Sequence, residues 1–114
     1  MIKTKKQKKE KPKSEFVQKI INILKNNHQI IEEKEFKAKE YKCLISINSD
    51  LGQITFLTQA KDKKTVSETD LKKLLSDAQS IPLPALFIYT GKLSKKAIEF
   101  AEKYFSVIKV RKVA

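Results

Sequence analysis

The chain has 114 residues, with 25 lysine and arginine residues against 13 acidic residues and a formal net charge of +12. Its single cysteine excludes an intrachain disulfide, and its single histidine excludes a structural zinc site built from histidine and cysteine ligands. No apolar run approaches the roughly 20 residues that cross a bilayer, so we expect a soluble, cytoplasmic protein with no membrane partner.

Lysine dominates the start of the chain. Residues 1–13 contain seven lysines and one acid, with too few apolar side chains to offset the entropy cost of ordering. The sequence therefore predicts a disordered basic arm over 1–13 and one folded domain over 14–114. Such an arm attracts polyphosphate because neutralising phosphates releases counterions, although it could also serve as a solubilising tail. The arm lysines expected to contact phosphate are Lys5, Lys6, Lys8 and Lys9.

The folded part begins with an amphipathic helix. Apolar residues follow Ser14 at the three- and four-residue spacing of one helix face, and Asn26-Asn27 is a plausible stop. The apolar residues of this face are Phe16, Val17, Ile20, Ile21 and Leu24. Residues 29–37 are expected to be extended.

Two strands then form a predicted hairpin, Tyr41–Asn48 and Gln53–Lys61, around a four-residue loop that contains Gly52. This loop sets a register in which Glu40 faces Lys61 and Lys42 faces Gln59. A shift by one residue would mix the two faces, which supports the register. One face is apolar and expected to be buried, and the other is mixed and partly polar. The apolar face comprises Tyr41, Cys43, Ile45, Ile47, Ile54, Phe56, Thr58 and Ala60.

The second half alternates helices and strands. Ser67 and Asp70 form a capping box that opens a helix bearing Leu71, Leu74, Leu75 and Ala78. A buried strand is predicted at Ala85–Tyr89, and Ser94 caps a last helix before a strand at Val107–Val110. The predicted order α-β-β-β-α-β-α-β indicates an α/β fold with a central mixed sheet flanked by helices.

Two segments of this order resemble a known family. The stretch FLTQAKDKKTVSETDLKKLL (residues 56–75) is similar to the Gln-x-Lys strand and following helix of the restriction-endonuclease-like PD-(D/E)XK superfamily. The nearest branch is that of type IV restriction enzymes and archaeal Holliday-junction resolvases. The stretch ALFIYTGKLSKKAIEFAEKY (residues 85–104) resembles the same branch's strand, Gly-x-x-Ser turn and helix. The resemblance implies a restriction-endonuclease-like fold over most of residues 14–110.

The resemblance also implies a chemistry, because this family hydrolyses phosphodiesters with a bound Mg²⁺. Gln59 matches a metal-ligand position and Lys61 matches the family lysine. The acid expected on the preceding strand is absent: Lys42 stands opposite Gln59, and Glu40 is the nearest carboxylate. Glu40, Gln59 and Lys61 are therefore the candidate catalytic residues, with Glu40 and Gln59 as metal ligands if the chain is active. The incomplete set instead indicates a degenerate site.

Other chemically capable residues have plainer interpretations. Asp50 lies at the far end of the hairpin and fits turn chemistry, and Glu15 suits the first turn of its helix. His28 is interpreted as a surface residue, and Cys43 as a core residue rather than a nucleophile. The acids Glu32, Glu33 and Glu35 are interpreted as a solvated strand face. The lysines expected to contact nucleic acid in the folded domain are Lys61, Lys63, Lys64, Lys92, Lys95 and Lys96.

Three functional hypotheses follow from the sequence. We expect first a nucleic-acid-binding protein with a nuclease-like fold and no working catalytic centre, with DNA as a better candidate than RNA and no cofactor. The second hypothesis is an active Mg²⁺-dependent endonuclease that uses Glu40, Gln59 and Lys61. The third is a protein-interaction or dimerisation domain that pairs through its sheet edge, which leaves a homodimer open.

Overall fold

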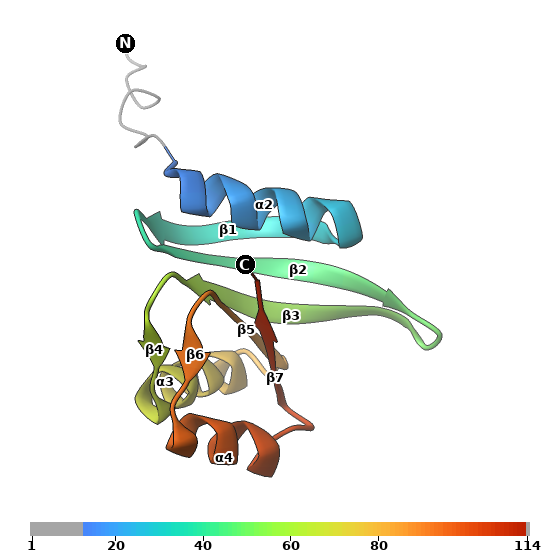
Figure 1. Cartoon of the computed structure of the whole chain (residues 1–114). Coiled ribbons are helices and arrows are strands. Elements are labelled where there is room, and N and C mark those ends of the chain that lie inside the picture. The colour runs from blue at the N-terminus through green and yellow to red at the C-terminus, as the bar shows by residue number, and fades with distance from the viewer. Residues whose placement is uncertain (1–12, 114) are drawn as a thin grey trace.

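The computed structural model describes residues 13–113. Three helices and seven strands form from these residues, in an order that confirms the α/β class predicted from the sequence (Figure 1). The helices are α2 (Glu15–Asn27), α3 (Glu68–Ser80) and α4 (Lys95–Lys103). The strands are β1 (Gln29–Lys37), β2 (Glu40–Ser49), β3 (Gly52–Lys61), β4 (Thr65–Val66), β5 (Ala85–Tyr89), β6 (Lys92–Leu93) and β7 (Ile108–Lys112).

Five strands form one mixed sheet in the order β1-β2-β3-β5-β7. The pairs β1–β2 and β2–β3 are antiparallel, whereas the pairs β3–β5 and β5–β7 are parallel. The parallel part requires crossover connections, and α3 and α4 supply them. A second, two-stranded parallel sheet joins β4 to β6. The two serines predicted to cap helices, Ser67 and Ser94, do so, and Ser14 caps α2 in the same way.

The predicted register of the hairpin is confirmed along its whole length. Glu40 pairs with Lys61, Lys42 with Gln59, and Asn48 with Gln53. The predicted loop length is wrong, because the strands continue by one further pair, between Ser49 and Gly52. The turn is therefore two residues long, and it closes because Gly52 adopts a φ of 106°, which strongly favours glycine.

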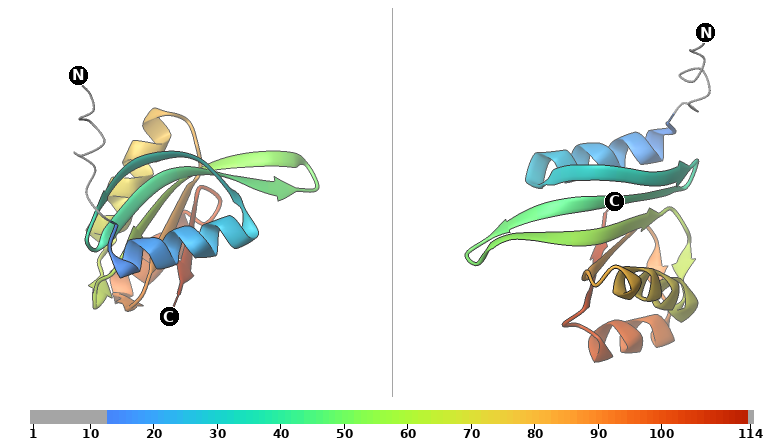
Figure 2. Two further views of the ribbon diagram at one scale, coloured as in Figure 1. Left: turned by 90° about the horizontal axis from the view of Figure 1, so that it is seen from above. Right: turned by 180° about the vertical axis from the view of Figure 1, so that it is seen from behind.

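Helices cover the sheet from both sides, and each side has its own apolar core. Figures 1 and 2 show α2 lying along β1 and β2, and α3 and α4 on the other side of the sheet. Alternation along β5 divides its side chains between the two cores. Leu86 and Ile88 pack toward α2, whereas Ala85 and Phe87 pack toward α3 and α4. The α2 core also contains Tyr41, Cys43, Ile45 and Ala60.

The far end of the hairpin projects beyond the helices (Figure 2). Leu51 at its tip is 93% exposed, and Ile54 is 36% exposed. The expectation that the whole apolar face is buried is therefore wrong at this end, because neither core reaches the tip. Burial is complete where α2 covers the hairpin, at Tyr41, Cys43 and Ile45.

The remaining differences from the predicted elements concern short strands. The strand predicted at Val107–Val110 instead runs from Ile108 to Lys112, and β4 and β6 were not predicted at all. Two-residue strands carry no periodicity, and their pairing joins segments far apart in the chain. No helix in the described part of the chain combines the length and apolar character needed to cross a membrane.

Candidate nucleic-acid interface

The predicted catalytic residues share one face of the hairpin. Side chains alternate along a strand, so the pairs Glu40–Lys61 and Lys42–Gln59 project to the same side. Apolar residues of α3 pack over the neighbouring part of this face, through the cluster that contains Leu57 and Leu74. The start of α3 therefore meets the end of β3, where Lys61 lies.

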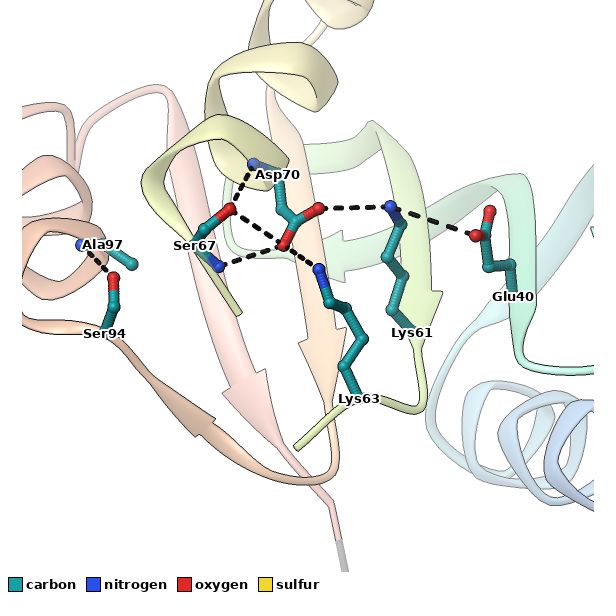
Figure 3. Close-up of polar contacts among 7 residues, drawn as sticks. All are labelled: Glu40, Lys61, Lys63, Ser67, Asp70, Ser94 and Ala97. Atoms are coloured by element: carbon teal, nitrogen blue, oxygen red, sulfur yellow. Dashed lines mark hydrogen bonds and ion pairs between the residues drawn. The ribbon is translucent and has the colours of Figure 1, made fainter. Parts of the chain in front are cut away.

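Asp70 in the first turn of α3 is the acid that binds Lys61. The Lys61 Nζ lies 3.2 Å from Asp70 Oδ1 and 4.0 Å from Glu40 Oε2. Lys63 Nζ lies 2.7 Å from the other Asp70 oxygen, Oδ2. Figure 3 shows Lys61 reaching between Asp70 and Glu40, with Lys63 approaching Asp70 from the loop side. Both lysines are therefore committed to one carboxylate.

The capping box fixes the position of Asp70. The Ser67 backbone N–H donates to Asp70 Oδ2 at 3.0 Å, and the Asp70 N–H donates to Ser67 Oγ at 3.4 Å. Burial alone would raise the pKa of Asp70, but hydrogen bonds from Lys63, the Ser67 backbone and Lys61 outweigh it and lower that pKa to about 2. Asp70 therefore stays ionised throughout the neutral range.

A second acid of α3 binds the second lysine of the same sheet face. Lys42 donates to Asp77 Oδ2 at 2.8 Å. Asp70 and Asp77 are seven residues apart, which is two helical turns, so they lie on one side of α3. The helix thus places one carboxylate against Lys61 and another against Lys42.

These contacts determine what surrounds the predicted metal ligands. Glu40 faces the Lys61 ammonium, and half-buried Gln59 pairs with Lys42 and precedes Lys61 by two residues on the same face of the hairpin. An ammonium group repels a divalent cation at such short range. Among residues 13–113, no three acidic, histidine or cysteine side chains gather closely enough to hold a metal ion.

Two other predicted lysines, Lys64 and Lys92, are brought together by the small sheet. The Lys92 N–H donates to the Lys64 carbonyl at 3.1 Å, and Thr65 pairs with Lys92. Gly91 makes this approach possible, because a Cβ at that position would overlap the carbonyl oxygens of Lys63 and Lys64. A close backbone crossing thus sets the spacing of the two segments.

The last two predicted lysines begin α4, directly after β6. Ser94 caps this helix by accepting from the Ala97 N–H at 3.1 Å, and Lys95 and Lys96 occupy the first two helical positions. Unlike α3, this helix has no acid in its first turn. Lys64, Lys92, Lys95 and Lys96 are all exposed, and none forms an ion pair within residues 13–113. We call these four residues the lysine patch.

The N-terminal candidates fall into two groups. Lys5, Lys6, Lys8 and Lys9 lie outside the described residues. Lys13, the last residue of the predicted arm, is described by the structure: its Nζ lies 3.5 Å from Glu33 Oε1 and 4.8 Å from the centre of the Phe36 ring.

The plainer interpretations of Cys43 and of the strand and helix carboxylates fit the structure, whereas that of His28 does not. Cys43 is fully buried, and burial raises the pKa of its thiol to about 12. The carboxylates of β1 and α2 are exposed, and Glu33 accepts from the Tyr41 hydroxyl at 2.8 Å. His28 is half-buried rather than fully at the surface, and burial followed by the charge of Arg111 lowers its pKa. The exposed acids are Glu15, Glu32, Glu33 and Glu35.

Sequence reasoning missed Asp70 and Asp77 as partners of the site lysines. The capping box already placed Asp70 at the start of the helix that follows Lys61 and Lys63, which was the available signal. Asp77 gave no comparable signal, because its pairing with Lys42 spans 35 residues.

No family model, curated protein or solved structure matches the chain.

Proposed function

We propose that this chain binds nucleic acid through phosphate contacts made by the lysine patch, on a nuclease-like α/β fold without a working catalytic centre. Duplex DNA is the proposed ligand. Lysine binds phosphate as a point charge, and phosphate is the same in every nucleotide, so we expect little sequence preference.

One observation carries the proposal: the fold neutralises some of its lysines and leaves others available. Lys61, Lys63 and Lys42 are held by acids of α3. The lysine patch has no such partner within the described residues, although its members lie on adjoining segments. Clustering exposed like charges opposes folding, so a phosphate-bearing ligand is a physical reason for the arrangement.

The same observation supports loss of catalysis. Lys61 matches the family lysine, but its ammonium is engaged by Asp70 and lies near Glu40. A Mg²⁺ ion held by Glu40 and Gln59 would have to approach both Lys61 and Lys42. The donor set therefore does not fit a divalent cation in this arrangement, and no reaction step is assigned to one.

Salt-dependent binding tests the proposal. We expect affinity for a nonspecific DNA duplex to fall linearly on a log–log plot against salt, and the slope to shrink by about 3–4 when all four patch lysines become alanine. Fluorescence anisotropy with the full chain measures both quantities. The patch substitutions are Lys64→Ala, Lys92→Ala, Lys95→Ala and Lys96→Ala.

A matched variant removes the same charge elsewhere. Four exposed lysines on α2, β1 and the β1–β2 turn form no ion pair within residues 13–113, and their loss should change the slope much less. These are Lys19, Lys25, Lys37 and Lys39. Equal slopes for the two quadruple variants would overturn the assignment to the lysine patch. A third variant without residues 1–12 measures the share contributed by the basic arm.

The nuclease hypothesis is tested on the same material. We expect no cleavage of linear or branched DNA with Mg²⁺ or Mn²⁺. Metal-dependent cleavage that disappears in both Glu40→Ala and Lys61→Ala would instead establish an active site at these residues. That result would refute the degenerate centre while leaving the phosphate contacts of the patch intact.

A further inference from the structure

An apolar groove of about 340 Å³ runs between α4 and β7, on the opposite edge of the sheet from β1. It is lined largely by Leu93, Ile98, Ala101, Phe105, Ile108 and Val110, with Glu102 and Lys109 as its charged members. Phe105 is 66% exposed and Ile98 is 44% exposed. Two large apolar side chains therefore remain in water beside an edge strand.

The backbone of β7 provides hydrogen-bonding groups next to this groove. The Val113 N–H donates to Tyr89, and the Ala85 N–H donates to Val107, so the odd-numbered residues of this segment bond to β5. Successive residues of a strand point their backbone groups to opposite sides. The N–H groups of Val110 and Lys112 therefore face the outer edge, where a further strand would pair.

The charge of this edge selects among possible occupants. Residues 103–114 contain Lys103, Lys109, Arg111 and Lys112 and no acid. Pairing β7 with β7 of a second copy would set these cations against each other, which is destabilising. The other edge strand, β1, carries acids, but two irregularities interrupt its register, and such bulges hinder edge-to-edge pairing.

We propose that the β7 edge binds an extended acidic segment of a partner protein, which adds to the sheet as a sixth strand. Its backbone pairs with Val110 and Lys112, its carboxylates lie against the cations of β7, and one large apolar side chain enters the groove beside Phe105. Strand addition of this kind takes affinity from main-chain hydrogen bonds and specificity from side-chain pockets. This surface acts independently of the proposed nucleic-acid contacts.

A pair of synthetic peptides tests the proposal. The first is a fluorescent hexapeptide in which glutamate alternates with valine and a central phenylalanine, and the second has serine at every apolar position. Both carry the same charge, so simple attraction to a chain of net charge +12 affects them equally. We expect the apolar peptide to bind the full chain at least tenfold more tightly by anisotropy. Equal affinities would overturn the proposal.

Two exposed apolar residues supply a matched pair of variants. Phe105→Ala removes the groove side chain and should weaken binding of the apolar peptide at least fivefold. Leu51→Ala removes a side chain that is more exposed, at the hairpin tip, and should leave binding unchanged. Loss of affinity in both variants, or in neither, would contradict docking in the groove.

Amide hydrogen exchange measured by NMR locates the added strand. Peptide binding should slow exchange at Val110 and Lys112 and leave the amides of β1 unchanged. If exchange at Val110 and Lys112 is already slow without peptide and sedimentation shows a dimer, the occupant of this edge is a second copy of the chain and the proposal is wrong. If a DNA duplex displaces the peptide and slows exchange at Val110 and Lys112 to the same extent, the edge binds nucleic acid and the proposal is wrong.

Discussion

The starts of α3 and α4 are built from the same parts and have opposite charge. Each follows a two-residue strand, β4 or β6, and each begins at a serine whose side chain accepts from the backbone three residues later. In α3 the next residues include Glu68 and Asp70, whereas α4 continues with Lys95 and Lys96. The two helices therefore share a serine cap, but the residues after the cap are acidic in α3 and basic in α4.

The difference lies in the third helical position. Asp70 occupies it in α3 and binds Lys61 and Lys63 from there. Ala97 occupies it in α4 and is fully buried, so no carboxylate is available at that point. Cations at a helix N-terminus oppose the helix dipole, which makes the α4 start electrostatically unfavourable without an anion. The fold therefore pairs the lysines beside the start of α3 with a carboxylate, whereas the lysines at the start of α4 remain exposed.

A substitution that forces β4 and β6 apart should reduce the free energy of unfolding more than any other change considered. In Gly91→Ala the added methyl group would overlap the carbonyl oxygens of Lys63 and Lys64, which are backbone atoms and cannot turn aside. We expect the free energy of unfolding to fall by about 3 kcal/mol or more, at the upper end of overpacking costs. Urea denaturation measures the change.

The second glycine is the control for this substitution. Gly52 has a positive φ, but a methyl group added there would meet no atom within 4 Å, so Gly52→Ala carries a conformational cost alone. That cost should be about 1–2 kcal/mol. A Gly91→Ala chain as stable as Gly52→Ala would show that β4 and β6 can move apart freely.

Removing the acid of α3 should make its start resemble that of α4. Asp70→Asn leaves Lys61 and Lys63 without their carboxylate, and we expect a loss of about 2 kcal/mol in the free energy of unfolding. The two released lysines should also raise DNA affinity and steepen its salt dependence by up to about 2. Denaturation and anisotropy on one preparation test both effects.

The control uses the other acid of the same helix. Asp77→Asn releases Lys42 alone, and Asp77 is more exposed than Asp70. Its effects on stability and on DNA binding should therefore be smaller. Equal effects of the two substitutions would contradict the central position of Asp70.

Lowering the pH should gradually remove the stabilisation that ionised Asp70 gives to the start of α3. The pKa of Asp70 is about 2 in the folded chain against an ordinary 3.8, so its ionised form is favoured by folding. The resulting stability is complete well above pH 4 and is lost as the pH falls toward 2, with about 1 kcal/mol gone at pH 3. The difference in unfolding free energy between the wild-type chain and Asp70→Asn should narrow by that amount. A constant difference from pH 7 to pH 3 would show that Asp70 does not titrate as described.

Local signals were enough to predict most of the fold. The hairpin register followed from the placement of the turn and was supported by the alternation of apolar residues, and the helix starts followed from Ser14, Ser67 and Ser94. The strand Ala85–Tyr89 was predicted at its observed bounds. Strands β4 and β6 escaped prediction because their pairing is long-range and only two residues long. The restriction-endonuclease-like topology itself stays a prediction.

The site was predicted less completely than the fold. The pairing of Glu40 with Lys61 followed from the register, because facing positions in a hairpin are fixed once the turn is placed. The preference of Lys61 for Asp70 depends on how α3 packs across the sheet, which no sequence period encodes. Whether a lysine is neutralised or available is therefore a tertiary property, and here it decides the proposed function.

Giving α4 an acid should have the smallest effect on stability and the clearest meaning. Lys95→Glu places a carboxylate where α3 carries Glu68, the first helical position after the serine cap. The helix dipole favours this change, so the free energy of unfolding should rise by about 0.5 kcal/mol. DNA affinity should fall in the same variant, because one phosphate contact is replaced by a repulsive charge. Thermal denaturation and anisotropy together test whether Lys95 lowers the stability of the fold while it raises the affinity for DNA. A variant that gains stability and keeps its DNA affinity would remove the α4 start from the interface.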